Sequence, residues 1–199
     1  MHMFNLSENS FMAAGMRKLR EDFGAKLSRG AIAGLVAGFG FVLANMYYAK
    51  ANGLPAIAPF LAFSTVFNAT AQPVLAAPAI PLEFAEGLVA HIILSLSFGM
   101  SFGILSAFLP NRKAIAIGAI GFGLALFILN FEILGRTAFP FFTAPNGPNN
   151  VFEGFIHPLI FGGLLIPFFW GAAARRRSVG GGGARNGEIE VPAAVGAGV

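Results

Sequence analysis

The chain contains no cysteine and few charged residues. Only 11% of its 199 residues are charged, whereas an ordinary soluble domain has about 25%. Without cysteine, the chain can form no disulfide, no thiolate metal site and no cysteine nucleophile. The low charge accompanies a hydrophobic content of 56% and a mean hydropathy of +0.71. These values are typical of a chain that is surrounded mostly by lipid.

Motifs for catalysis and phosphate binding are also missing from the sequence. The glycines lie in apolar stretches or near the C-terminus, and none belongs to a phosphate-binding loop that ends in Lys-Ser or Lys-Thr. The sequence contains neither a His-Glu-x-x-His zinc motif nor a Gly-x-Ser-x-Gly nucleophile elbow. We therefore expect a protein that is not an enzyme.

Four apolar stretches are long enough to cross a bilayer, which takes about 20 residues per helix. They cover residues 30–48, 88–109, 114–134 and 155–174. Only the segment from Pro110 to Lys113 separates the second stretch from the third, so these two should form a tight hairpin. The sequence thus predicts an all-α integral membrane protein, with a four-transmembrane-helix bundle in a membrane domain of residues 30–177.

The lysines and arginines indicate how this bundle is oriented. Cytoplasmic loops of membrane proteins carry an excess of these residues. A four-span arrangement puts eleven of the thirteen on one side, namely Arg17, Lys18, Arg20, Lys26, Arg29, Arg112, Lys113, Arg175, Arg176, Arg177 and Arg185. This positive-inside pattern predicts a multi-pass protein of the plasma (inner) membrane with both termini in the cytoplasm. Because the cations mark orientation, we expect no nucleic-acid partner.

Three segments lie outside the predicted spans. Residues 1–29 form a basic cytoplasmic segment, in which residues 11–27 have the pattern of an amphipathic helix, either on the membrane surface or in solvent. The first outer loop, residues 51–87, is long and rich in proline, and its apolar part, residues 57–71, is too short to span. We expect that part to be interfacial or re-entrant. Residues 178–199 are glycine-rich and predict a disordered cytoplasmic tail.

Small residues recur every four positions in the first two spans. In lipid, helices associate through close backbone approach, which small residues permit. The stripes consist of Gly30, Gly34 and Gly38 in the first span and of Ser95, Gly99 and Gly103 in the second. They predict helix-packing surfaces, either within the bundle or against a partner.

Two prolines, Pro158 and Pro167, interrupt the fourth predicted span. Each lacks the amide hydrogen of a helical bond and crowds the carbonyl group four residues earlier. We therefore expect kinks, which either open a cavity or are accommodated by packing.

Ionisable and polar residues gather toward the predicted outer side of the bundle. Such groups inside a span are costly and usually mark function, a partner or a water-filled cavity. The candidate residues for ion binding or a proton relay are His91, Asn130, Glu132, Arg136, Glu153 and His157. Glu132 and Arg136 are four residues apart, as are Glu153 and His157, so each pair shares a helix face. The two histidines should lie at matching depth, because the second and fourth spans run in the same direction.

Three interpretations of this polar cluster stay open. His91 and His157 are candidate ligands of a transition metal or of haem, since imidazole and carboxylate suit zinc, copper and iron. The cluster could instead conduct ions or protons, because imidazole changes charge near neutral pH. In a purely structural interpretation, the histidines lie in the interfacial zone and the carboxylates favour the first turns of helices.

For the whole protein, we expect first a non-catalytic membrane subunit that packs against other membrane proteins, or against itself, in a larger complex. The grounds are the small-residue stripes, the small soluble portion and the missing catalytic motifs. The first alternative is a small transporter or channel that moves ions or protons through the polar cluster. The second is a membrane protein that binds a metal or haem through His91 and His157.

Overall fold

The computed structural model describes residues 5–67, 81–144 and 147–171, and every regular element in these ranges is helical. In chain order they are α1 (Asn5–Glu21), α2 (Phe23–Ala51), α3 (Ala58–Ser64), α4 (Pro81–Leu105), the 3-10 turn η1 (Ser106–Phe108), α5 (Arg112–Phe127), the π-helix η2 (Ile128–Leu134), α6 (Gly135–Thr137), the 3-10 turn η3 (Pro140–Thr143), α7 (Asn150–Ile156) and the π-helix η4 (His157–Gly162). Residues 163–171 continue η4 as α-helix.

Four helical stretches among the described residues are long and apolar enough to cross a membrane, as the sequence predicts. They are Phe23–Ala51, Pro81–Phe108, Arg112–Thr137 and Asn150–Gly171. All four start earlier than the apolar segments chosen from the sequence, because the polar and proline residues at their N-terminal ends continue the helices. The predicted tail, residues 178–199, lies outside the described residues, as do residues 172–177.

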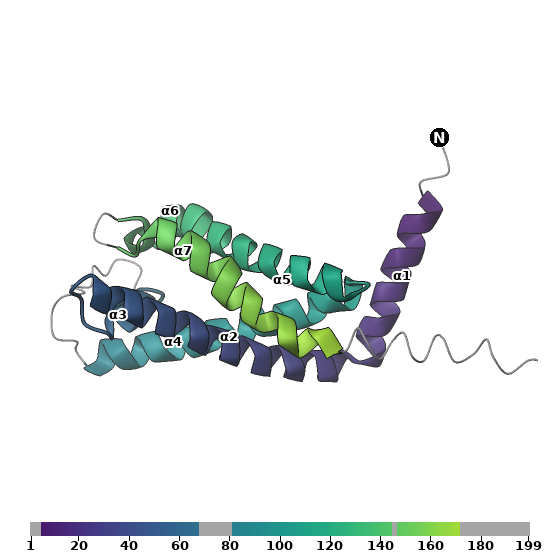
Figure 1. Cartoon of the computed structure of the whole chain (residues 1–199), viewed down its shortest axis with the longest axis horizontal. Helices are drawn as coiled ribbons and strands as arrows, with labels where there is room; N and C mark the ends of the chain where they lie inside the picture. The colour runs from purple at the N-terminus through teal and green to yellow at the C-terminus, as the bar shows by residue number, and fades with distance from the viewer. Residues whose placement is uncertain (1–4, 68–80, 145–146, 172–199) are drawn as a thin grey trace, which may run out of the picture.

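The four long stretches run side by side along the long axis of the molecule (Figure 1). We call the end with the α4–α5 turn, residues 106–113, the hairpin end, and the opposite end, which carries α3 and α6, the α3 end. Figure 1 shows α1 running across the direction of the spans at the hairpin end, where it packs against η1. Gly15 of α1 lies directly against the Phe108 ring.

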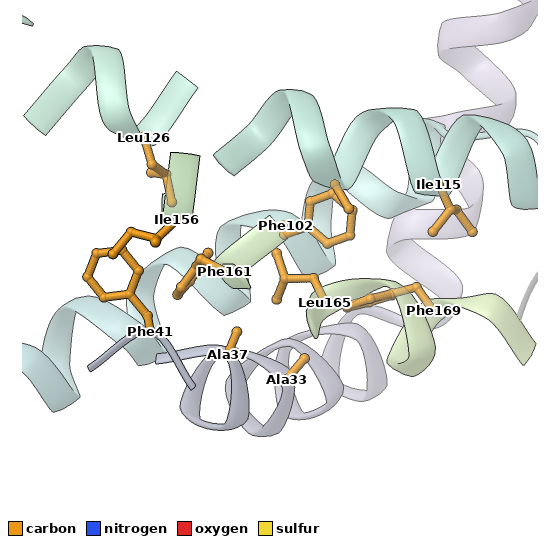
Figure 2. Close-up of a cluster of buried hydrophobic side chains, with 11 residues drawn as sticks. Ala33, Ala37, Phe41, Phe102, Ile115, Leu126, Ile156, Phe161, Leu165 and Phe169 are labelled. Carbon is orange, nitrogen blue, oxygen red and sulfur yellow. The ribbon is translucent and has the colours of Figure 1, made fainter. Parts of the chain in front are cut away.

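One hydrophobic cluster joins the four spans (Figure 2). Its buried members are Ala33, Ala37 and Phe41 of α2, Phe102 of α4, Ile115, Ala119 and Leu126 of α5, Ile156 of α7, and Phe161, Leu165 and Phe169. Large apolar side chains also cover the outside of the bundle, as Phe39, Ile117 and Leu159 illustrate with about 60% of their surface exposed. Helices that are apolar all round suit a lipid surrounding.

The two small-residue stripes face each other in the contact between α2 and α4. A Cβ atom placed on Gly30 would lie 2.5 Å from the carbonyl oxygen of Gly99. A Cβ on Gly34 would lie 2.8 Å from the Gly99 Cα, and one on Gly38 would meet the Ser95 hydroxyl. Gly103 of α4 likewise lies against the backbone of Lys26. All six predicted packing residues therefore lie in one contact inside the chain.

The apolar part of the first loop forms the short helix α3, which packs on α4. The Phe60 carbonyl lies against Gly87, and the Phe60 and Phe84 rings meet edge to face with centroids 5.0 Å apart. α3 thereby covers the start of α4. Of residues 57–71, the last four lie outside the described residues, as does the rest of the loop up to residue 80.

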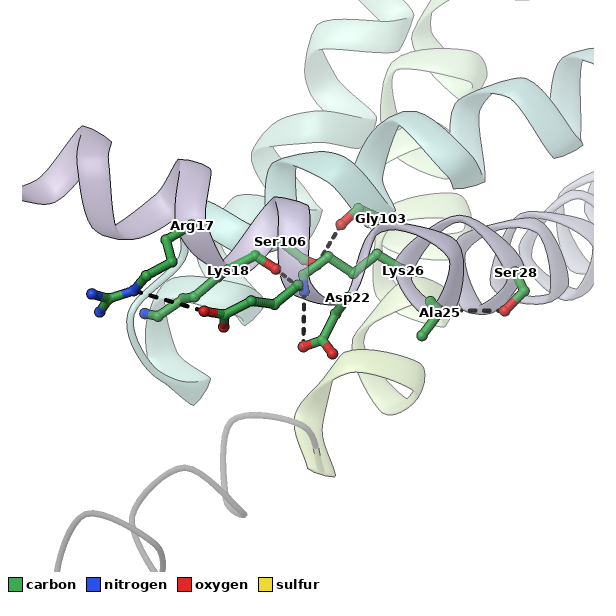
Figure 3. Close-up of polar contacts among 9 residues, drawn as sticks. Arg17, Lys18, Asp22, Ala25, Lys26, Ser28, Gly103 and Ser106 are labelled. Carbon is green, nitrogen blue, oxygen red and sulfur yellow. Dashed lines mark hydrogen bonds and ion pairs between the residues drawn. The ribbon is translucent and has the colours of Figure 1, made fainter.

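A buried lysine joins α1 to α2 (Figure 3). Lys26 is 5% exposed, and its Nζ donates to the Lys18 carbonyl oxygen at 3.0 Å and to the Asp22 carboxylate at 3.3 Å. It thus adds a second hydrogen bond to a carbonyl group in the last turn of α1, which also accepts from the Asp22 amide at 3.3 Å, and a cation there suits the helix dipole. Because α2 already begins at Phe23, residue 29 lies inside a helix rather than at a boundary.

Candidate functional site

A cavity of about 130 Å³ lies between the spans in the half of the bundle toward the α3 end. Residues of all four spans and of α3 contribute to its wall. Its polar lining consists of Asn45, His91, Ser95, Asn130, Glu153 and His157. Four of the six predicted ion-site residues thus come together around one space, although they belong to three different spans.

Phenylalanine rings make up much of the remaining wall. They are Phe41, Phe63, Phe98, Phe131, Phe139, Phe142 and Phe161. A mostly aromatic space with a few convergent polar groups is the usual composition of a small-molecule site. Phe139 and Pro148 belong to the wall as well, so the cavity reaches the segments that connect the helices at the α3 end.

Glu153 and His157 form a buried pair on the cavity wall. They are 4% and 6% exposed. His157 Nδ1 lies 2.9 Å from the backbone oxygen of Glu153 and 3.3 Å from its carboxylate Oε2. Because a carbonyl oxygen can only accept, Nδ1 carries a hydrogen and donates it to the backbone. Within the described part of the chain, Oε2 is therefore left without a hydrogen-bond partner.

A buried carboxylate oxygen without a hydrogen bond is a costly feature of a helical bundle. A buried ionised carboxylate requires a proton, a counter-charge or hydrogen bonds to offset its lost hydration. His157 contributes such a counter-charge only when its second ring nitrogen is also protonated. The alternative source of positive charge is a cation inside the cavity.

Aromatic rings enclose the His157 imidazole. The Phe41 ring meets it edge to face with centroids 4.6 Å apart, and the Phe131 ring lies at 5.7 Å. A third ring, that of Phe127, lies at 6.0 Å. Together with the backbone bond to Glu153, these contacts hold the imidazole in one orientation on the cavity wall.

His91 also lines the cavity and binds the backbone of α2. Its Nε2 is 3.0 Å from the Gly38 carbonyl oxygen, so Nε2 carries the donated hydrogen. The Phe63 ring of α3 covers the imidazole at a centroid distance of 4.9 Å. Since Gly38 has no side chain, His91 can reach a backbone oxygen that another residue would shield.

Two π-helical segments contribute to the cavity wall. Asn130 and Phe131 belong to η2, whereas His157 and Phe161 belong to η4. A π-turn inserts one extra residue and turns the side chains before it relative to those after it, and such turns occur frequently at functional sites. Pro158 lacks the amide hydrogen that would bond to Gly154 in an α-helix, which favours the wider turn of η4. The kink predicted at Pro158 is therefore a π-helical turn.

Glu132 and Arg136, the other predicted pair, do not line the cavity. The Glu132 carboxylate accepts hydrogen bonds from Arg136 Nε at 2.9 Å and from Nη2 at 2.7 Å. The two side chains are 40% and 61% exposed, so they form a surface ion pair on the outside of the bundle. Equal spacing in the sequence has thus produced one exposed pair and one buried pair.

The metal hypothesis has little support from this arrangement. In the ranges that the structure describes, no three His, Asp or Glu side chains gather where they could hold a metal ion. The two histidines alone would leave at least half of a metal's coordination positions to other ligands. The backbone bond that each histidine makes leaves its other ring nitrogen free, as in metal-ligating histidines, so only the small number of ligands counts against the site. These residues do not fit a metal site built from protein ligands.

Sequence reasoning missed the aromatic wall and two polar members of it. Asn45 is an amide inside an apolar span, which is itself a detectable signal. Ser95 was assigned to helix packing alone, yet it both meets Gly38 and lines the cavity. Nothing in the sequence distinguishes the seven lining phenylalanines from the others among the 23 in the chain.

Comparison of the chain with models of protein families, with curated proteins and with solved structures finds no match.

Proposed function

We propose that the protein is a small membrane transporter or channel that moves a cation or protons by way of the cavity. The observation that carries the proposal is the Glu153 carboxylate, which is 4% exposed, lines the cavity and leaves Oε2 without a hydrogen bond from any described residue. Intramembrane carboxylates are rare and usually serve substrate, ion or proton pathways. Here the protonated Nδ1 of His157 lies 3.3 Å away as a neighbouring proton donor.

Glu132 and Arg136, which the sequence suggested as part of the pathway, are left out of the proposal because they lie on the outside of the bundle. The working residues are Glu153 and His157, with His91, Asn45 and Asn130 as further polar groups around the space.

The distribution of charge suggests how this pathway is oriented. Arg112 and Lys113 lie in the α4–α5 turn, and the basic helix α1 lies across the same hairpin end (Figure 1). By the positive-inside rule, the hairpin end faces the cytoplasm of a plasma (inner) membrane and the cavity lies toward the outer side. We further propose that α1 lies on the cytoplasmic membrane surface, where its exposed Met12 and Met16, together with Phe23 at the start of α2, would enter the interface.

Flux measurements on reconstituted protein test the proposal. Proteoliposomes should produce electrical currents on a supported membrane when a gradient of protons, Na⁺, K⁺ or an organic ammonium ion is applied. In the Glu153→Gln variant, an uncharged amide of the same shape replaces the carboxylate. We expect the current to fall at least about tenfold, because the amide provides no negative charge to bind a cation and takes up no proton.

The Glu132→Gln variant is the matched control, because it removes a carboxylate from the same half of the bundle but outside the cavity. It should retain the current. An absence of current for every cation tested, or equal losses in both variants, would refute a transport function of the cavity.

A non-catalytic membrane subunit is the second candidate function. One of its grounds was that the small-residue stripes could bind a partner, and the structure does not support that ground. The small-residue stripes of α2 and α4 pack against each other and are not available to a partner. One observation still favours it: Gly121 of α5 is exposed and has nothing within 4 Å of where its Cβ would be, next to exposed Ile117 and Leu124. Native mass spectrometry from membranes would show a defined complex if this candidate is right, and a single chain if it is wrong.

A further inference from the structure

With Glu153 ionised and both imidazoles neutral, the cavity wall carries one formal negative charge and no compensating positive charge. Each histidine needs only one ring hydrogen for the backbone bond it makes, His91 to Gly38 and His157 to Glu153. Neutral imidazoles thus satisfy both bonds. No lysine or arginine belongs to the described residues that line the space. An ionised Glu153 carboxylate would accordingly favour a positively charged ligand over a neutral or negative one.

The aromatic side chains of the cavity wall favour organic cations over hard metal cations. The faces of aromatic rings carry partial negative charge and attract cations, most effectively those that shed water easily. Hard metal cations such as Mg²⁺ and Ca²⁺ instead require a shell of about six to eight oxygen ligands. Much of this wall is phenylalanine, and few oxygen atoms converge on it. The composition suits an ammonium group that carries alkyl substituents.

We propose that the cavity binds a small organic ammonium ion, whose charge lies at Glu153 and whose alkyl groups pack against rings such as Phe41 and Phe131. The ion would provide the positive charge that Oε2 of Glu153 lacks. The assignment of this ion as cargo rests on the proposed transport function, whereas its binding does not.

Equilibrium binding to the full chain in nanodiscs tests the proposal without any measurement of flux. Choline is a suitable first probe, and 3,3-dimethylbutanol is its neutral counterpart, with carbon in place of the charged nitrogen. Isothermal titration calorimetry should show saturable binding of one choline per chain. The neutral alcohol should bind at least about tenfold more weakly, because it lacks the charge that Glu153 and the rings recognise.

Two substitutions locate the bound ion. Glu153→Gln should weaken choline binding by at least about tenfold. Phe41→Leu should weaken it by about fivefold, since the ring contributes a cation–π contact that an aliphatic side chain cannot make. Phe102→Leu is the matched control for Phe41→Leu: Phe102 is fully buried in the same hydrophobic cluster but does not line the cavity, so choline affinity should not change.

The outcomes separate this inference from the proposed function. Failure of choline, and of tetramethylammonium as a second probe, to bind chains that still conduct protons or inorganic ions would overturn the inference and leave transport intact. Binding without any flux would support the ligand class and refute transport. Equal affinity for choline and the neutral alcohol, or unchanged affinity in Glu153→Gln, would show that the space recognises apolar shape rather than positive charge.

Discussion

At the scale of single residues, two carboxylates with the same sequence signature have opposite environments. Glu132 and Glu153 each precede a basic partner by four positions. Glu132 is paired with Arg136 on the exterior, whereas Glu153 is buried next to His157 on a cavity wall. Of these two carboxylates, only Glu153 borders the cavity.

Glycines in different spans also have different environments: Gly34 lies in the tight contact between α2 and α4, whereas Gly121 lies on the open surface of α5. We predict that Gly34→Ala lowers the free energy of unfolding by about 1–3 kcal/mol, because the added Cβ would overlap the backbone of α4 and force the helices apart. A Cβ at this position would lie 2.8 Å from the Gly99 Cα. Reversible unfolding in mixed detergent micelles, followed by circular dichroism, measures the change.

Gly121→Ala is the control for that substitution, because nothing lies within 4 Å of where its Cβ would be. It should change stability by no more than about 1 kcal/mol, in the stabilising direction expected of alanine in a helix. Equal effects of the two substitutions would contradict the close contact between α2 and α4.

At the scale of elements, the two π-helical segments decide which side chains reach the cavity. In an α-helix each residue adds about 100° of rotation, so one inserted residue turns everything beyond it by that amount. η4 begins at His157 and directly follows α7, which contains Glu153, and η2 contains Asn130. The widened turns thus set the positions of three of the six polar lining residues relative to the rest of their helices.

We predict that Pro158→Ala weakens the site while the helix becomes more regular. The new amide hydrogen could bond to the Gly154 carbonyl and replace the π-turn with an α-turn, which removes a proline penalty of up to about 3 kcal/mol. The free energy of unfolding should not fall, whereas choline affinity and cation current should. Titration calorimetry, current measurements and unfolding on the same samples provide the comparison.

Pro167→Ala is the matched control in the same span, because residue 167 lies beyond η4 in the α-helical part and does not line the cavity. It should leave choline affinity and current unchanged. A Pro158→Ala protein with normal affinity would show that the π-turn does not position the site.

At the scale of the whole molecule, the bundle is polarised along its long axis. The cavity lies toward the α3 end, while α1 and the α4–α5 turn place basic residues at the hairpin end (Figure 1). At this end Lys26 of α2 links the two helices, because its Nζ donates hydrogen bonds to the Lys18 carbonyl of α1 and to the Asp22 carboxylate between them. If the four helices cross a membrane, basic residues therefore lie at one membrane surface and the cavity lies near the other.

This polarity predicts the topology of the protein in the cell. A green fluorescent protein fused after Arg177 should fluoresce and an alkaline phosphatase at the same site should be inactive, because the positive-inside rule puts that end in the cytoplasm. A phosphatase inserted between residues 144 and 147 should instead be active. The opposite pattern at both sites would place the hairpin end outside and reverse the proposed direction of the pathway.

Sequence reasoning recovered the four spans because span formation depends on local quantities. The transfer of about 20 apolar residues into lipid is favourable whatever their neighbours are. The short helix α3 was also foreseeable, since its apolar residues are too few to span and proline lies at its N-terminus. The ends of the helices were less predictable, because hydropathy marks apolar residues and not the limits of backbone hydrogen bonding.

By itself, the sequence determined that this chain forms four apolar helices and that a few polar residues must lie within them. The structure alone decided that the glycine stripes of α2 and α4 meet, that Glu153 faces inward and Glu132 outward, and that phenylalanines from distant segments enclose one space. The physical reason is rotational. Hydropathy fixes which residues enter a helix, but the direction in which each side chain points depends on how the helices pack and on the extra residue in each π-turn.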